Sequence, residues 1–572
     1  MTHGRLLWLL VDGLSLPLLR LLAPRLPPCA TTLPLRPLAP NCQTPPSLFS
    51  IWSGLPESAH RLTGYDMPVE GHASPLAIRE AFANWPQDVA MVWDDWAAGG
   101  GQVRTCAVPF VQPQRLAGAL LSHSQVYTPA LAAPRLLRAG ETLVIEALGV
   151  QWPVEGHGDS LRLRNTPEGV VDLPLHQTRH LRLSDAVPAT VAGHTHRAIA
   201  LRTVRVEGEL RLCMMGFQPV WIEGRDAPQR QAAFRHRAYA ALNPARLYAD
   251  GALGLRLDAG GHGHAETLLL DLLHVVHQSF LEDICWTLDA PGGELVVAYY
   301  PVIDLLSHQL LRTMVSPANA AERDVAGQIL ARVAEWLGEL LLSCQRRLAP
   351  GSRLVAHADH GMLPIHQEFS LNRWLHQQAW LTLDAEGGID PQHSLVFYHP
   401  AENGWLAVHP ERLAAAQLDL SSLIGTLNQW FLDEGPSPSA MTPAFRLIPG
   451  PEVSTGQGWQ SQWYVQPPDG VRLRADVHRP MLAPARKGGD HTCWSPNPWL
   501  EAALLDTEPT GVTWPSTVAL TDLAPALLGW LRLRHAGAPA MASTTSTTST
   551  KTEGAAPHAC APAATAPTAP TP

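Results

Sequence analysis

The sequence lacks the closely spaced cysteines from which disulfide scaffolds and cysteine-ligated zinc ribbons are built. Its eight cysteines are scattered over 572 residues, and no two of them form a CxxC pair. Small disulfide-stabilised folds and zinc ribbons both need denser spacing than this. We therefore interpret most of the cysteines as buried thiols.

Long hydrophobic runs are also missing. No segment has the roughly 20 consecutive apolar residues that a membrane-spanning helix requires. The opening stretch, MTHGRLLWLLVDGLSLPLLRLLAP, is the only candidate signal peptide, but Asp12 interrupts its apolar run and it has no clean A-x-A cleavage site. The sequence thus predicts a cytoplasmic protein with no membrane partner.

The chain has no surplus of positive charge. Its formal net charge is −10 at neutral pH, so it has no general electrostatic attraction to nucleic acid or to anionic lipid. Duplex nucleic acid is therefore not an expected partner. An anionic substrate must be held locally, by metal ions, a helix dipole or a few placed cations. The sequence carries no indication of the oligomeric state.

Strand and helix patterns alternate through most of the chain. The strand-like apolar runs are LLWLLV at 6–11, ELVVAYYPV at 294–302 and RLVAHA at 353–358. Amphipathic helical patterns cover 266–285 and 319–347. Continuous apolar runs of this length are typical of parallel strands that are buried on both faces. The alternation predicts an α/β fold in which helices sandwich a central, mostly parallel sheet.

Two segments depart from this pattern. Residues 141–224 consist of short alternating runs, such as VRVEGELRL, separated by Gly, Asp and Pro, and they indicate a β-rich insertion or cap. Residues 536–572 hold too few large apolar side chains to offset the entropy of ordering them, which predicts a disordered tail. We therefore expect one catalytic domain, formed by 1–140 and 225–535.

Aspartate and histidine recur where strands end and helices begin. Asp304 and His308 are four residues apart in a helical pattern, so both side chains fall on one face and could bind the same ion. The alternative is an ordinary hydrogen-bonded surface pair. Asp359 and His360 follow an apolar strand, and Gly361 supplies a turn that could bring their side chains together. The alternative there is a polar strand end.

Asp12 and His491 stand alone in the sequence. Asp12 ends the first strand and could simply cap the helix after it, whereas His491 follows a flexible Gly-Gly and would by default be a solvated loop histidine. Together with the two Asp-His pairs, however, they supply nitrogen and oxygen ligands suited to zinc or another divalent ion. Their number is sufficient for two metal sites.

Thr44 precedes two prolines and a short apolar run, TPPSLFSIWS. With Thr44 as the N-cap, Pro45 at the first helical position and Ser47 in the first turn, the segment predicts a helix whose free N–H groups surround the threonine hydroxyl. The positive end of a helix dipole binds phosphate and favours an alkoxide over a neutral hydroxyl. The alternative is a capping threonine with no chemical role.

The order of these motifs resembles the alkaline phosphatase superfamily, and most of all its type I phosphodiesterase/nucleotide pyrophosphatase branch. The similar segments are LLVDG at 9–13, QTPPSLFSIWSGLPESAH at 43–60, YYPVIDLLSH at 299–308, HADHGM at 357–362, GGDHT at 488–492 and TDLAPALLGWL at 521–531. They follow the family's order through nearly the whole chain.

The resemblance implies a hydrolase with two divalent metal ions, with zinc as the first expectation and manganese or iron as the alternatives. Its substrate would be a small phosphate ester such as a nucleotide. One ion would be held by Asp12, Thr44, Asp359 and His360, and the other by Asp304, His308 and His491. Thr44 would be the nucleophile and would form a phosphothreonine, which water then hydrolyses.

Two positions depart from the family's pattern. Ser47 stands where members commonly carry asparagine, so its hydroxyl or backbone N–H groups would stabilise the non-bridging oxygen. Thr492 replaces the usual glycine after the last histidine, which leaves His478 as an alternative ligand to His491. The predicted activity is cleavage of phosphodiester or nucleotide pyrophosphate bonds. A phosphonate or phosphomonoester hydrolase on the same site, or a catalytically silent binding protein of this fold, are the alternatives.

Overall fold

A computed structural model describes residues 4–27, 31–125, 132–183, 190–191, 194–195, 198–216, 220–234, 244–435, 444–507 and 512–535. Its centre is a nine-stranded sheet in the order β17-β6-β5-β18-β1-β19-β29-β2-β30. The strands are β17 (Trp221–Glu223), β6 (Leu120–Gln125), β5 (Val103–Cys106), β18 (Leu295–Tyr300), β1 (Leu6–Val11), β19 (Arg353–His357), β29 (Ala502–Asp506), β2 (Thr31–Arg36) and β30 (Val518–Ala519).

The middle of this sheet is parallel. Strands β6, β5, β18, β1 and β19 run in the same direction, and β29 is antiparallel to both of its neighbours. All six residues of β1 are buried, which explains why LLWLLV is apolar at every position and does not alternate. Since Leu10 pairs with both Tyr299 and His357, the three central strands end at one edge of the sheet. Ligand sites in open α/β sheets form at this edge.

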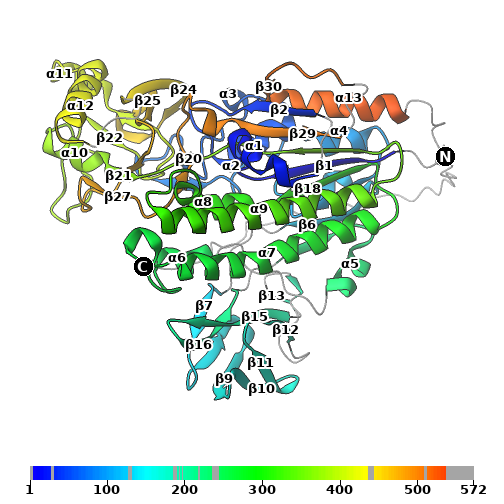
Figure 1. Ribbon diagram of the computed structural model, residues 1–572. Helices are drawn as coiled ribbons and strands as arrows, with labels where there is room; N and C mark the ends of the chain where they lie inside the picture. The colour runs from blue at the N-terminus through cyan, green and yellow to red at the C-terminus, as the bar shows by residue number, and fades with distance from the viewer. Residues whose placement is uncertain are drawn as a thin grey trace, which may run out of the picture.

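Helices cover both faces of the sheet, and the predicted α/β fold class is confirmed. On one face lie α7 (His264–Asp289), α8 (Val302–Val315) and α9 (Ala320–Arg347), and on the other lie α2 (Thr44–Ser53), α4 (Val92–Ala98) and α13 (Leu523–His535) (Figure 1). Shorter helices are α1 (Leu16–Leu22), α3 (Glu57–His60), α5 (Ala227–Phe234) and α6 (Ala245–Ala249). The Leu- and Val-rich faces of these helices and strands form one continuous core.

The β-rich segment lies below α7 in Figure 1. One of its sheets contains β11 (Gly169–Pro174), β10 (Ser160–Thr166), β9 (Val150–His157) and β8 (Thr142–Ile145), and the other contains β12 (Thr178–Arg182), β15 (Ala198–Val206), β16 (Glu209–Met214) and β7 (Arg135–Leu137). Both sheets share a small apolar core. Strand β7 precedes the expected boundary at 141, and β17, which lies inside that boundary, joins the central sheet.

A further unit stands within the expected catalytic segment 225–535. It has a sheet of β22 (Val396–Tyr398), β23 (Leu406–Val408), β25 (Gln460–Gln466) and β24 (Arg446–Ser454), and helices α10 (Leu371–Gln377), α11 (Pro410–Ala415) and α12 (Leu420–Glu434). Its aromatic core, which includes Phe397, Trp405 and Trp459, is separate from the main core. It forms the yellow end of the molecule in Figure 1.

Short strands connect this unit to the rest of the fold. They are β20 (Leu363–Pro364), β21 (Gln367–Ser370), β26 (Val471–Arg474), β27 (Leu482–Pro484) and β28 (Gly489–Asp490), and an isolated hairpin is formed by β3 (Asp66–Pro68) and β4 (Ile78–Glu80). The chain between β26 and β28 returns to the carboxyl edge of the central sheet, because β28 pairs with β20 just after β19. This return places His491 beside residues that are more than a hundred positions away.

The predicted disordered tail, 536–572, lies outside the described residues. Across the part of the chain that is described, no helix is both long enough and apolar enough to cross a membrane.

Candidate active site and metal centre

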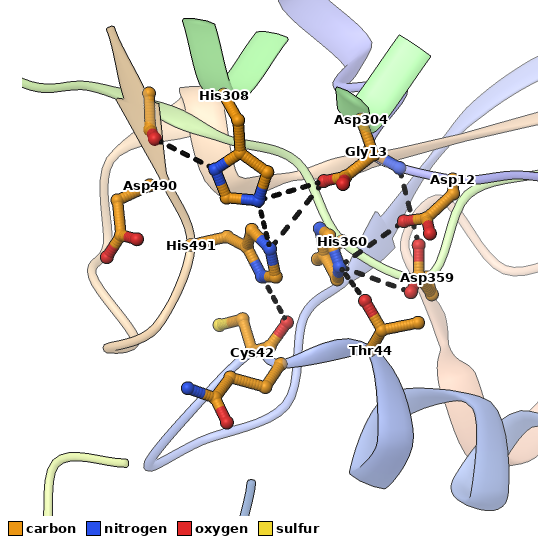
Figure 2. A network of polar contacts seen from close by, with 12 residues as sticks. Asp12, Gly13, Cys42, Thr44, Asp304, His308, Asp359, His360, Asp490 and His491 are labelled. Carbon is orange, nitrogen blue, oxygen red and sulfur yellow. Dashed lines mark hydrogen bonds and ion pairs between the residues drawn. The ribbon is translucent and has the colours of Figure 1, made fainter. Parts of the chain in front are cut away.

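The structure brings the sequence-predicted site residues together at the carboxyl edge of the sheet (Figure 2). Asp12 follows β1, Asp304 and His308 lie on the first two turns of α8, Asp359 and His360 follow β19, and His491 follows β28. Thr44 begins α2. By contrast, His478, the alternative to His491, is an exposed residue that packs beside Gly387.

Glycines allow the close approach of these segments. Gly13 has φ of +71°, and a Cβ atom there would lie 2.9 Å from both Cα and Cβ of Asp304. Its N–H donates to Asp359 Oδ1 at 3.4 Å. Gly361 has a different role from the turn expected of it, because its φ is not positive; a Cβ there would lie 2.1 Å from the carbonyl oxygen of Trp499. Close backbone packing is therefore what requires glycine at 361.

The three histidines point the same ring nitrogen toward the centre of the site. Each Nδ1 lies against a backbone carbonyl oxygen: His308 with Gly489 at 3.0 Å, His360 with Gly361 at 3.0 Å, and His491 with Cys42 at 3.1 Å. A neutral histidine that donates through Nδ1 has a lone pair on Nε2. Here Nε2 of His308 lies 3.2 Å from Nε2 of His491. Two lone pairs that face each other at this distance repel, so a shared cation would stabilise the arrangement.

Three carboxylates surround these nitrogens. Asp304 Oδ1 lies 3.5 Å from Nε2 of His308 and 3.6 Å from Nε2 of His491. Around His360 Nε2, Asp359 Oδ2 lies at 3.2 Å and Asp12 Oδ1 at 3.5 Å. Within the described part of the chain, these three carboxylate oxygens are buried and accept no hydrogen bond. Buried carboxylate oxygens without hydrogen-bond partners that face imidazole nitrogens form a donor set suited to a divalent cation.

The donor atoms form two overlapping groups. Asp304, His308 and His491 make up one, and Asp12, Asp304 and His360 make up the other; in each group the donor atoms lie within 4.8 Å of one another. The first group has the same members as the second predicted ligand set. Asp304 also stands in the other group, which its sequence position did not indicate, because only the fold sets α8 beside the ends of β1 and β19.

Burial and mutual repulsion shift the pKa values of this cluster. Burial, together with the nearby carboxylates of Asp359 and Asp304, raises the pKa of Asp12 well above its ordinary value. Burial raises the pKa of Asp304 to about 7. Burial and neighbouring positive groups hold the pKa values of His308 and His491 well below the ordinary one. The Asp359–His360 pair is the exception: despite burial, the Asp359 carboxylate raises the pKa of His360, and His360 lowers the pKa of Asp359. At Asp12, Asp304, His308 and His491 the site opposes both acid ionisation and histidine protonation, a conflict that bound cations would remove.

Thr44 differs in one respect from its predicted position. It is the first residue of α2, and Gln43 is the N-cap, since the carbonyl oxygen of Gln43 accepts the N–H of Ser47 at 3.2 Å. Pro45 and Pro46 have no N–H to offer. The start of α2 thus presents the N–H of Thr44, which has no acceptor among the described residues, rather than the ring of free N–H groups that was expected.

The hydroxyl of Thr44 faces the cluster. Its Oγ1 lies 3.2 Å from His360 Nε2, and its side chain is fully buried. Ser47, one turn further along α2, is also fully buried, and its Oγ has no hydrogen-bond partner among the described residues. A buried hydroxyl without a partner has an unmet cost of about 1–3 kcal/mol, which a ligand atom could relieve.

Residues 215–436 match the family model for type I phosphodiesterase / nucleotide pyrophosphatase. The matched segment carries Asp304, His308, Asp359 and His360, and thus four of the clustered donors. The match confirms the resemblance indicated by the motifs and the predicted enzyme class, a hydrolase of the phosphodiesterase/nucleotide pyrophosphatase type. No curated protein sequence matches the chain.

Solved structures resemble the chain only distantly. Human ectonucleotide pyrophosphatase / phosphodiesterase 5 is 10% identical and has a TM-score of 0.42; the similarity extends over 92% of this chain and 95% of the human chain. Phosphonoacetate hydrolase from Sinorhizobium meliloti 1021 is 12% identical, with coverage of 92% and 96% and a TM-score of 0.41. Alkaline phosphatase PafA is 12% identical, with coverage of 93% and 96% and a TM-score of 0.40. Similarity at this level decides neither substrate nor mechanism.

Sequence patterns missed several residues of the site. The hydroxyl of Tyr299 donates to Asp12 Oδ2 and orients it. A cleft of about 230 Å³ opens onto His308 and His491, and its walls include Gln43, Tyr65, Asp66, Glu402, Arg472, Lys487 and Asp490. Tyr65 also contacts Thr44, and burial together with the Asp12 and Asp304 charges raises the pKa of its hydroxyl. Gln43, Tyr299 and Asp490 lie inside the motif segments, but the motifs gave them no role. The other positions come from segments that only the fold brings together.

Proposed function

We propose that the protein is a metal-dependent hydrolase that cleaves phosphodiester or nucleotide pyrophosphate bonds through a phosphothreonine on Thr44. The observation that carries the proposal is the convergence of three histidine rings and of buried carboxylate oxygens without hydrogen-bond partners beside the hydroxyl of Thr44. The family match supports the reaction class. A small phosphate ester, such as a nucleotide, is the proposed substrate.

The donor set supports two divalent cations. Asp304, His308 and His491 would hold one, and Asp12, Asp359, His360 and Thr44 would hold the other. Imidazole nitrogen and carboxylate oxygen suit zinc, and manganese or iron are compatible with the same ligands. Two bound cations would supply Lewis-acid stabilisation of the phosphoryl oxygens and of the attacking and departing oxygens.

The protein's own groups orient the reaction. Thr44 Oγ1 attacks phosphorus, the P–O bond to the leaving group breaks, and water later hydrolyses the phosphothreonine. The position of Thr44 at the positive end of α2 favours the charged form of its oxygen. Tyr299 holds Asp12 through a hydrogen bond, and the backbone carbonyls of Gly489, Gly361 and Cys42 hold the three imidazole rings in place. We assign to Ser47 the stabilisation of a non-bridging oxygen.

The proposal is tested by turnover of bis-p-nitrophenyl phosphate and p-nitrophenyl phosphate, after chelation and after addition of Zn²⁺ or Mn²⁺. We expect diester hydrolysis that requires metal. Thr44→Ala should lower turnover by about 10³-fold or more. The variant should lose at most one bound metal ion. His308→Ala should lower both turnover and bound metal.

His478→Ala is the matched control for His308→Ala, because His478 is the exposed histidine outside the cluster. It should retain wild-type metal content and turnover. Monoester turnover far above diester turnover would contradict the diesterase assignment. Unchanged turnover and unchanged metal content in both Thr44→Ala and His308→Ala would show that the site lies elsewhere.

A further inference from the structure

Lysine is almost absent from this chain. Of the 41 basic Lys and Arg residues, only two are lysines, Lys487 and Lys551. Lys551 lies outside the described residues. Lys487 lines the cleft beside His308 and His491. A chain that uses arginine at nearly every basic position thus has a lysine beside its candidate active site.

Structural ion pairs in this protein are made by arginine. The fully buried guanidinium groups of Arg353, Arg230 and Arg104 pair with Asp506, Asp283 and Asp226, respectively. Lys487 has no such partner: within the described segments, no carboxylate oxygen lies within 4.0 Å of its Nζ atom, and no acceptor is in hydrogen-bond range. A structural role in an ion pair therefore does not account for it.

Two of the three carboxylates on the cleft wall are already engaged by arginines, and the third, Asp66, forms no ion pair with Lys487 within the described residues. Glu402 pairs with Arg474 at 2.9 Å, and Asp490 lies 3.5 Å from Nε of Arg472. The charge of Lys487 therefore acts on the cleft itself, and it is felt at Asp304 and His308. Burial and the neighbouring Arg472 lower the pKa of the Lys487 ammonium, although the carboxylates of Asp490 and Asp304 act in the opposite direction from a distance.

The backbone fixes Lys487 in place. The next residue, Gly488, donates its N–H to the carbonyl oxygen of His308 at 2.8 Å, and its own carbonyl oxygen accepts the N–H groups of Arg312 and Ile365 at 3.1 Å each. A Cβ at 488 would lie 2.4 Å from the carbonyl oxygen of Gln309, so the loop packs directly on α8. These contacts keep the backbone of Lys487 beside the helix that carries two metal-ligand candidates, so its side chain enters the cleft next to them.

We propose that Lys487, supported by Arg472, is a specificity-determining cation that binds a second anionic group of the substrate, next to the phosphate ester that is cleaved. The substrate class is then a phosphate ester with a charged arm, either a further phosphate-type group or a carboxylate. The inference rests on the proposed hydrolase function and adds to it the chemistry of the group beside the scissile bond. Lysine suits this position because it is a compact charge whose three donors rotate to fit different anions.

The test uses three esters with the same leaving group. Methyl p-nitrophenyl phosphate has an uncharged arm, and its carboxymethyl and phosphonomethyl analogues have a charged one. Lys487→Met should raise KM for the charged-arm esters by about tenfold or more, which is the range of one charge-assisted contact. It should change KM for the methyl ester by less than about twofold. Lys487→Arg should keep most of the preference. The two charged esters show whether phosphonate or carboxylate is preferred.

Lys551→Met is the matched control, because it removes the only other lysine and changes the net charge equally. It should leave all three KM values unchanged. If Lys487→Met does not fold, Lys487→Gln replaces it in the test, and its melting temperature shows that it is folded. Equal losses for the three esters, or no loss for any, would overturn the proposal.

A separate binding measurement distinguishes failure of this inference from failure of the proposed function. If the wild type hydrolyses none of the esters, the hydrolase function is wrong. Isothermal titration of the methyl and carboxymethyl esters into metal-loaded wild type and Lys487→Met then still decides the subsite. Tighter binding of the charged ester that is lost in Lys487→Met supports the anion subsite, and equal binding of both esters refutes it.

Discussion

The stability of the metal-free protein should depend on pH through Asp304. Burial raises the pKa of this carboxyl to about 7, from an ordinary value of 3.8. The folded, metal-free protein therefore keeps the proton of Asp304 up to neutral pH, whereas the unfolded chain loses it near pH 4. A group whose pKa is raised on folding contributes its stability below the unfolded-state pKa, and this contribution is lost as the pH rises to the folded-state pKa. The window is thus about pH 4 to 7.

The magnitude follows from the shift. Roughly three pKa units at about 1.4 kcal/mol each give a ceiling of about 4 kcal/mol. Since the pKa of Asp12 is raised as well, the cluster can share the proton, and a substitution at Asp304 alone should relieve about half of this cost. Asp304→Asn keeps the size of the side chain and removes its charge. In EDTA, the variant should gain about 2 kcal/mol relative to wild type between pH 4.5 and pH 8, or about 2 °C in Tm for a chain of this size.

With zinc at pH 8, the wild type should instead be more stable than Asp304→Asn. Asp304 is a donor in both groups, so the wild type should gain more stability from the metal than Asp304→Asn does. Thermal unfolding followed by circular dichroism at pH 4.5, 6 and 8, with EDTA or with zinc, measures both effects. Asp88→Asn, at an exposed aspartate, is the control and should show neither. The reasoning would be refuted if, in EDTA, the Tm of Asp304→Asn differed from that of the wild type by the same amount at all three pH values.

Three further predictions concern single residues. Ser47→Ala should lower kcat for the diester by about 10- to 100-fold while metal content stays unchanged and Tm does not fall, and steady-state kinetics with metal analysis and thermal unfolding would check this; an unchanged kcat would exclude Ser47 from the reaction. Gly13→Ala should lower bound metal and turnover together, because the added Cβ would lie 2.9 Å from the Asp304 backbone at a positive φ; retention of full metal content would contradict the packing described for this turn. Arg353→Met should destabilise the protein by about 3–5 kcal/mol in denaturant unfolding, since it removes the guanidinium that neutralises the fully buried carboxylate of Asp506; a loss below about 1 kcal/mol would contradict this role of the ion pair.

Local patterns were sufficient for the elements that carry the site. The six-residue apolar run before Asp12 predicted a parallel strand because a strand buried on both faces must be apolar throughout. The four-residue spacing predicted that Asp304 and His308 share a helix face, and α8 places them so. The N-cap was displaced by one residue, to Gln43, because a Thr-Pro-Pro sequence fits either register of the first turn.

Separate units and long-range contacts were harder to predict. The aromatic unit around Phe397 and Trp459 has the same strand and helix texture as the main domain, so nothing local separates its core. Lys487 and Arg472 stand in no motif, and their common cleft appears only when β26 and β28 return to the sheet edge. The near absence of lysine was visible in the sequence, but its meaning depends on where Lys487 lies.

The sequence by itself determined which chemistry is available: the strands, the helix faces, and the aspartates, histidines and threonine at their ends. Hydrophobic periodicity and backbone preferences act over a few residues, so a single sequence expresses them directly. Tertiary structure alone decided that Asp304 contributes to both donor groups, that Nε2 of His308 faces Nε2 of His491, and that a single lysine lines the described cleft. These facts depend on distances between segments that are hundreds of residues apart, and such distances are set by the packing of the whole sheet and its helices.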